Sequence, residues 1–194
     1  ITTKCKGKIN DLEEKINPRI HMGSIGIGHT RWATHGEPNT KNAHPHSDSS
    51  KQFSLIHNGI IENHYAIKEY LVAKGIEFSS DTDTEVLVQF IGYIYSTKKM
   101  NFYDAVRTVL KEVIGAYGIL IICKDEPNRI IAARNGSPLV LGLGKGDWLW
   151  TSPITFVASA NCGLYCGAKV DFVDIDPKTY NLSTDALEEK LIQA

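Results

Sequence analysis

The stretch from Tyr117 to Cys123 is almost entirely apolar, and a turn at Asp125 to Asn128 follows it directly. A run of this length and composition predicts a β-strand covered on both faces. The chain returns from Arg129 to Ala133, which predicts an antiparallel partner. Leu139 to Leu143 and Trp148 to Thr151 flank a glycine-rich turn and predict a hairpin. Strands that come in blocks, rather than alternating strictly with helices, favour an α+β fold with mainly antiparallel sheets.

Helices and two further strands are predicted ahead of this block. Apolar residues at helical spacing predict four helices: a short turn at Asn10 to Ile16 capped by Asn10 or Asp11, Glu62 to Lys74 capped by Gly75, Val86 to about Tyr95, and Phe102 to Val113. Alternating residues predict a strand at Ser24 to His29 and another at Phe53 to His57. The turn dipeptide Asn58-Gly59 is expected to stop the second strand.

The character of the chain changes near Leu149 to Ser152, where we expect a domain boundary. We divide the chain into residues 1–149 and 150–194. The tail reads as a helix at Phe156 to Leu164, a strand at Val170 to Ile175 and a last helix to Gln193, capped by Ser183. This is a short βα-type pattern, unlike the blocks before it.

Composition narrows the class of partner. The chain has 194 residues and a net charge of −1, which gives no electrostatic reason to expect nucleic acid or a membrane surface as a partner. No apolar run approaches the roughly 20 residues that span a bilayer. The four unevenly spaced cysteines are typical of reduced thiols, which favours a cytoplasmic location.

Polar side chains are densest between Gly28 and Asn63. Six of the seven histidines lie between His29 and His64, on what reads as a loop between short strands, and this is typical of a binding site. A metal site is one alternative, since His44-Pro45-His46 can place two imidazoles on one side of an extended strand. Because no zinc-type spacing completes it, we predict no metal, and His44 is expected to order the loop by hydrogen bonding.

Six motifs in this order carry a family resemblance: HTRWATHG (29–36), NAHPH (42–46), HNGIIEN (57–63), SDTDTE (80–85), GAYG (115–118) and ARNGSPLVLGLG (133–144). They resemble the glutaminase domain of the glutamine–fructose-6-phosphate amidotransferases (glucosamine-6-phosphate synthases), which are class II glutamine amidotransferases. The resemblance implies an αββα sandwich of the N-terminal-nucleophile hydrolase type. It also implies release of ammonia from L-glutamine to a sugar-phosphate isomerase domain, for amino-sugar synthesis.

The resemblance assigns the two ends of glutamine to two residues. Arg31 is expected to grip the α-carboxylate through a two-pronged contact, and Asp83 to pair with the α-ammonium. Taken alone, Arg31 also reads as a surface arginine and Asp83 as a helix N-cap. Thr34 and His35 match residues that line the glutamine pocket. Trp32 matches a residue that gates ammonia passage, although it also reads as a core or lid aromatic.

Amide hydrolysis builds negative charge on the carbonyl oxygen, and a preorganised donor offsets about 3–4 kcal/mol of it. The Asn58 side chain and the Gly59 backbone N–H match the family's oxyanion hole. Taken alone, the same dipeptide reads as a plain hairpin turn.

The nucleophile of the family is a cysteine at the mature N-terminus, acting with its own α-amine. This chain begins at Ile1, and Cys5 falls at no matching position, so we expect a domain truncated at its N-terminus that does not hydrolyse glutamine measurably. The isomerase domains are also expected to be absent. Enzymatic activity is therefore uncertain, and marginal stability is expected.

The segment from Thr151 to Ser183 resembles an internal piece of a DegT/DnrJ/EryC1/StrS aminotransferase. In that family the aromatic at the position of Phe156 stacks on pyridoxal phosphate. The lysine and the acid that complete the site belong to other segments, so no cofactor is expected here. Three interpretations stay open: an amidotransferase fragment, a non-catalytic glutamine-binding module, or part of a pyridoxal-phosphate nucleotide-sugar aminotransferase.

Overall fold

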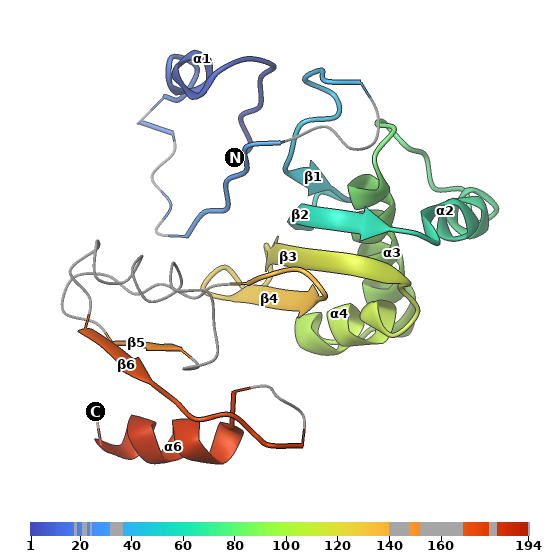
Figure 1. Cartoon of the computed structure of the whole chain (residues 1–194). Helices are drawn as coiled ribbons and strands as arrows, with labels where there is room; N and C mark the ends of the chain where they lie inside the picture. Colours follow the sequence, from blue (N-terminus) through green and yellow to red (C-terminus); the bar gives the residue numbers. More distant parts are fainter. Residues whose placement is uncertain are drawn as a thin grey trace. The chain divides into compact units, whose positions relative to one another are not determined.

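A four-stranded antiparallel sheet forms the centre of the first part of the chain (Figure 1). The computed structural model describes residues 1–17, 19–20, 23, 25–31, 37–139, 148–151, 169–178 and 182–193, with backbone alone at 148–151, 191 and 193. The sheet runs in the order β1 (His46–Ser47), β2 (Phe53–Ile61), β3 (Gly115–Cys123), β4 (Ile130–Asn135). The expected antiparallel return from Arg129 is confirmed, because Ile122 pairs with Ile130.

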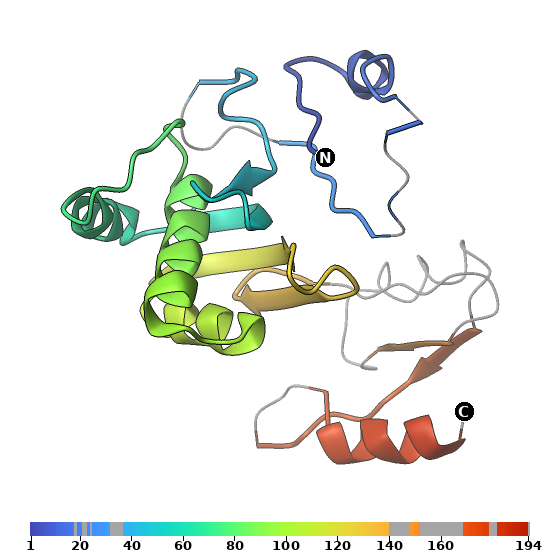
Figure 2. The same cartoon turned by 180° about the vertical axis from the view of Figure 1, so that it is seen from behind.

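Helices cover one face of this sheet. They are α2 (His64–Val72), α3 (Asp83–Lys98) and α4 (Phe102–Leu110), and a short α1 (Ile9–Glu13) lies in the N-terminal segment. Figure 2 shows α3 and α4 in front of the sheet, with α3 packed on β1 and β2 and with α2 and α4 packed on α3. Gly75 takes a left-handed conformation just after α2, as its expected place at the helix end requires.

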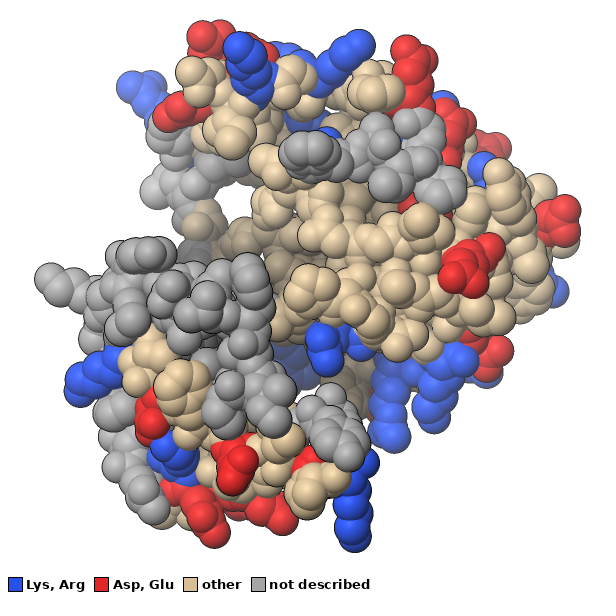
Figure 3. Space-filling model, viewed as in Figure 1, with Lys and Arg blue, Asp and Glu red and all other residues tan. Residues whose placement is uncertain are grey.

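The core lies between the sheet and these helices. Its fully buried side chains include Phe53, Leu55, Ile61, Leu71, Leu87, Val88, Ile91, Phe102, Val106, Ile119 and Ile121. Along β3 burial alternates, so the prediction of a strand covered on both faces is wrong for the described residues. The second sheet face carries half-buried and exposed apolar residues such as Ile60 and Ile130. Figure 3 shows this side of β2 and β3 as mostly uncharged surface.

Two further expectations for the first part are corrected. The described residues 25–29 form no strand, and β1 takes the place beside β2. Gly26 and Gly28 offer no side chain to pack against a neighbouring strand. The dipeptide Asn58-Gly59 does not stop β2, which continues to Ile61 because β3 supplies a partner along its whole length.

The chain divides into two units, Ile1–Pro138 and Leu139–Ala194. The second unit holds β5 (Trp148–Thr151) and β6 (Lys169–Phe172), which pair in parallel, and α6 (Thr184–Gln193). The Ser183 hydroxyl accepts from the Ala186 N–H at 3.2 Å, which confirms it as the cap of the last helix. The expected boundary at 149/150 stays a prediction.

Parts of the tail lie outside the described residues. They include almost all of the expected hairpin partner at 139–143 and the expected helix at 156–164. The α+β class, the mainly antiparallel sheet and the short βα tail are confirmed. None of the described helices combines the length and the apolar character that crossing a bilayer requires.

Candidate functional site

Four histidines gather around the middle of β2 and form what we call the imidazole cluster: His29, His44, His46 and His57. The ring centroids of His29 and His44 are 4.2 Å apart, and those of His44 and His46 are 5.1 Å apart and nearly perpendicular. The cluster joins segments that are distant in sequence, which is how the structure brings the first three motifs together.

The N-terminus of α3 holds two of these rings. His46 Nε2 lies 3.1 Å from Thr82 Oγ1, and His57 Nδ1 lies 3.1 Å from Thr84 Oγ1. Thr82 is the N-cap of α3, because its hydroxyl accepts from the Glu85 N–H at 3.2 Å. The alternative reading of Asp83 as the cap is therefore wrong.

His44 and His46 are neutral near pH 7 because the pKa of each is lowered. Burial, followed by the neighbouring His29 and His46, lowers the pKa of His44 to about 2. Burial, followed by the Lys4 ammonium, lowers the pKa of His46 to about 4. The Arg31 guanidinium contributes to both shifts, which places its positive charge close to the cluster.

Asp83 is buried at the edge of this cluster, with 5% of its surface exposed. Its Oδ2 accepts from the Ile61 N–H at 2.9 Å and lies 3.8 Å from His57 Nδ1. The Thr84 hydroxyl donates to Oδ1 at 3.4 Å. A carboxylate offers about four acceptor positions, so these contacts leave room for another donor.

Asn58 and Gly59 lie near the end of β2 and are exposed. Asn58 Oδ1 is 2.7 Å from His29 Nε2, which ties the first motif to the third. Gly59 has φ +122°, and a β-carbon there would collide with the Ala116 carbonyl oxygen. Only glycine fits this position without strain, because any other residue would carry that β-carbon at a positive φ.

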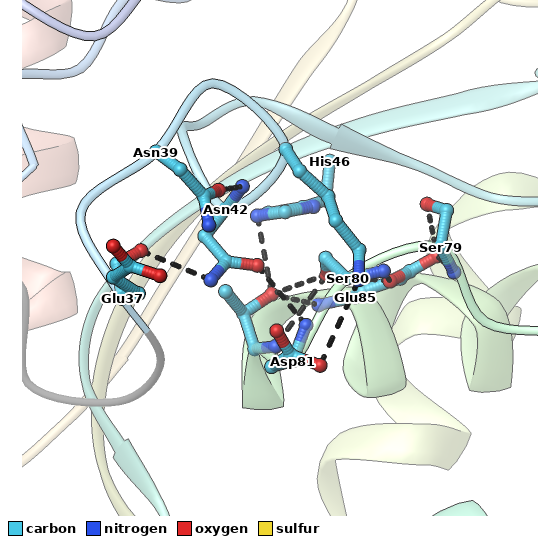
Figure 4. Close-up of polar contacts among 10 residues, drawn as sticks. Glu37, Asn39, Asn42, His46, Ser79, Ser80, Asp81 and Glu85 are labelled. Atoms are coloured by element: carbon cyan, nitrogen blue, oxygen red, sulfur yellow. Dashed lines mark hydrogen bonds and ion pairs between the residues drawn. The ribbon is translucent and has the colours of Figure 1, made fainter.

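A second group of polar contacts braces the loop that carries His44 and His46 (Figure 4). Asn42 is fully buried; its Nδ2 donates to the Glu37 carbonyl at 3.0 Å, and its Oδ1 accepts from the Asp81 N–H at 3.1 Å. We call this group, with Glu85 and its partners, the brace.

Glu85 is the charged member of the brace and is 2% exposed. It accepts from the backbone N–H and the hydroxyl of both Ser79 and Ser80. Burial raises the pKa of Glu85, but these hydrogen bonds outweigh burial and hold it below its usual range. The motif strings contain Asn42 and Glu85, yet nothing in the local sequence marks them as a brace.

Three predicted site residues, Trp32, Thr34 and His35, lie outside the described residues, whereas Arg31, Asn58, Gly59 and Asp83 lie within them. Within the described ranges no three His, Cys, Asp or Glu side chains are grouped to hold a metal ion. Two open grooves of about 340 and 430 Å³ lie between α4 and β4 and among α2, α3 and α4. Neither is lined by a predicted site residue.

A model of the glutamine amidotransferase domain matches residues 29–158. The chain belongs to this family. The described antiparallel sheet with helices on one face agrees with the N-terminal-nucleophile hydrolase type that the motif resemblance implies. A second model, of the DegT/DnrJ/EryC1/StrS aminotransferase family, matches residues 135–194.

Curated relatives agree with the first match. The chain is 53% identical over 152 residues to a glutamine–fructose-6-phosphate aminotransferase (isomerizing) of Bacteroides thetaiotaomicron, covering 78% of this chain and 25% of that one. It is 45% identical over 172 residues to the protein of that name from Clostridium tetani, covering 89% and 28%. The relative from Methanosarcina mazei is 44% identical over 195 residues, covering 96% and 30%.

The matched part therefore spans between a quarter and a third of these relatives' length. Among solved structures, a glutamine phosphoribosylpyrophosphate amidotransferase from B. subtilis is 28% identical, with a TM-score of 0.46 over 56% of this chain and 23% of that one. That likeness carries no conclusion.

Proposed function

We propose that this chain is the glutamine-binding and glutaminase part of a glutamine–fructose-6-phosphate transaminase (isomerizing). In that role it supplies ammonia for glucosamine 6-phosphate synthesis. The observation that carries the proposal is the family match over 29–158, together with 53% identity to a relative of that name. The matched range contains all the residues that we assign to the site.

Glutamine is held by its two charged α-substituents in this proposal. Arg31 binds the α-carboxylate, and Asp83 binds the α-ammonium. Two observations support this pairing: Arg31 lies near the imidazole cluster, and Asp83 is a buried carboxylate at the cluster's edge.

The amide end of glutamine faces Asn58 and Gly59. As the carbonyl carbon becomes tetrahedral, its oxygen gains negative charge, and the two N–H donors stabilise it by about 3–4 kcal/mol each. Thr34 and His35 line the pocket and Trp32 gates ammonia passage. The family's nucleophile, the N-terminal cysteine, supplies the attacking thiolate, so the role proposed for the described residues is binding and charge stabilisation.

We also propose a partner domain and a subcellular location. The ammonia acceptor is a sugar-phosphate isomerase domain, and the protein acts in the cytoplasm, where free thiols such as Cys5 and Cys123 persist.

Titration calorimetry with L-glutamine tests the proposal on the full chain. Saturable binding is expected, and Arg31→Ala should weaken it by at least 100-fold, because a two-pronged ionic contact is lost. Arg129→Ala is the matched control, since Arg129 pairs on the surface with Glu126 and should leave binding unchanged. Equal binding by Arg31→Ala and wild type would rule out the assigned pocket.

Release of glutamate, assayed in parallel, separates an enzyme from a binding module. Binding without release would favour a non-catalytic glutamine-binding module.

The tail supports a second candidate, part of a pyridoxal-phosphate nucleotide-sugar aminotransferase, through its match at 135–194. The described tail residues do not fit a cofactor site, because the Lys190 ammonium donates to Asp171 rather than standing as a reactive amine, and Phe156 lies outside them. We derive no chemistry through pyridoxal phosphate. A Schiff-base absorbance band on adding it would favour this candidate over the first.

A further inference from the structure

The hydrogen bond between His29 and Asn58 can run in either direction. Its direction decides whether the oxygen or the nitrogen of the Asn58 amide faces the substrate. The two atoms in contact, His29 Nε2 and Asn58 Oδ1, are 2.7 Å apart. A carboxamide oxygen only accepts hydrogen bonds, so His29 must donate from Nε2. The opposite arrangement, with the amide nitrogen donating to a bare Nε2, would turn the Asn58 oxygen outward. An outward oxygen would repel an oxyanion, whereas an outward amide nitrogen would bind one.

The surroundings of the His29 ring favour the first arrangement. His29 Nδ1 is buried and has no hydrogen-bond partner among the described residues. In a neutral ring only one nitrogen carries the proton. If Nδ1 carried it, a buried N–H donor would be left without an acceptor, which is rarer in folded proteins than a buried lone pair without a donor.

We propose that His29 is a positioning residue that donates from Nε2 to Asn58 Oδ1 and so turns the Asn58 amide N–H groups toward the substrate's carbonyl oxygen. This rests on the proposed function in one respect, the role of Asn58 as an oxyanion donor. His29 itself does not touch the substrate. It removes the rotational freedom of the carboxamide before the substrate binds, which is the preorganisation that an oxyanion hole needs.

The first test reads the tautomer directly and does not depend on activity. Long-range proton–nitrogen correlation spectra of the ¹⁵N-labelled full chain, at about pH 8 so that imidazoles of ordinary pKa are neutral, identify which ring nitrogen carries the proton. We expect the proton of His29 on Nε2. His64 is an internal reference of opposite type, because its Nδ1 lies 2.6 Å from the Ile61 carbonyl oxygen and must donate to it.

Assignment comes from His29→Gln and His64→Gln, each of which removes one set of signals. A His29 proton on Nδ1, or rapid averaging between both nitrogens, would overturn the proposal. Asn58→Leu removes the acceptor of the His29 N–H, but Nδ1 stays buried without a partner among the described residues, so the proton should remain on Nε2. Averaging between the two nitrogens in this variant would show that burial of Nδ1 does not set the tautomer and would overturn the assigned direction of the hydrogen bond.

The second test uses glutamine hydrolysis where the glutamate-release assay detects it; for a chain that binds glutamine without hydrolysing it, the tautomer spectra alone decide. His29→Leu should lower kcat by roughly 10- to 100-fold with little change in KM, because the donor acts mainly on the charge that develops in the transition state. His29→Gln should recover most of the loss, since its amide N–H replaces the imidazole donor. Equal losses in both variants would contradict the proposal. If glutamine does not bind at all, the proposed function fails, and the tautomer spectra decide about His29 separately.

Discussion

The brace and the imidazole cluster both hold the loop that carries His44 and His46, but they do so through different kinds of interaction. In the brace, the Glu85 carboxylate and the Asn42 amide have several partners each, and the charge of Glu85 is stabilised by hydrogen bonds. In the cluster, the Nδ1 atoms of His29 and His44 are buried without a hydrogen-bond partner among the described residues. The brace thus gains stability from charge and complete hydrogen bonding. The cluster depends on His44 and His46 staying neutral.

The largest effect is expected from cutting the brace. Glu85→Ala removes the carboxylate that accepts four hydrogen bonds from Ser79 and Ser80 and leaves the buried Ser80 N–H without its acceptor, so the free energy of unfolding should fall by about 3–5 kcal/mol. Urea unfolding measures it. Glu77→Ala is the control, because Glu77 is an exposed carboxylate close by, and it should change stability by about 0.5 kcal/mol at most. Similar losses of unfolding free energy in Glu85→Ala and Glu77→Ala would mean that the hydrogen bonds to Glu85 contribute nothing to stability.

As the pH is lowered, the imidazole cluster should lose stability before the brace does. The pKa values of His44 and His46 are lower in the folded than in the unfolded chain, so below pH 6.5 the unfolded state binds more protons. The stability that neutral His44 and His46 contribute is complete above about pH 6.5. It is lost as the pH falls through about 4 for His46 and toward about 2 for His44.

Unfolding free energies measured between pH 7 and pH 5 should therefore drop by about 2–4 kcal/mol. His44→Phe keeps a ring but removes one proton site, and the slope with pH should become shallower. An unchanged slope in His44→Phe would show that His44 is not neutralised by burial.

A smaller loss is expected at the corner that presents Asn58. Gly59→Ala places a β-carbon against the Ala116 carbonyl at φ +122°, and stability should fall by about 2–3 kcal/mol. Gly75→Ala is the matched control: it shares the left-handed conformation (φ +82°) but meets no atom within 4 Å, so it should lose only about 1 kcal/mol. Thermal or urea unfolding of both variants separates the close approach from the backbone conformation.

The smallest effect is expected from the exposed rim of the brace. Lys41 Nζ lies 3.8 Å from Asp81 Oδ1, and both side chains are more than half exposed. Lys41→Ala should change the free energy of unfolding by about 0.5 kcal/mol or less, because water and salt screen such pairs. A loss comparable to that of Glu85→Ala would mean that the brace extends to the surface.

Local chemistry in the sequence was enough for several elements. The Ser183 cap, the Gly75 helix end and the return strand after Asn128 follow from neighbouring residues alone, and the structure has all three. The motif resemblance pointed to the family, which the family match shows. The assigned roles of Arg31, Asp83, Asn58 and Gly59 stay predictions.

The errors arose where a distant segment decides the outcome. Asn58-Gly59 has the local signature of a turn, but nine residues of β3 pair with all of β2 and carry the strand through it. Asp83 has the signature of a cap, but Thr82 occupies that place and leaves the Asp83 carboxylate for the Ile61 N–H. The contact between His29 and Asn58 spans 29 positions and has no local sequence signal.

Successive residues of β2 point to opposite sides of the sheet, and this gives the strand a further role. His57 meets Thr84 in the helix layer, while the next residue, Asn58, meets His29. One peptide unit therefore separates the apolar interior from the amide donor of the proposed site. A shift of α3 is therefore expected to reach that donor through the main chain, so substitutions in the interior should also alter how the Asn58 amide is held.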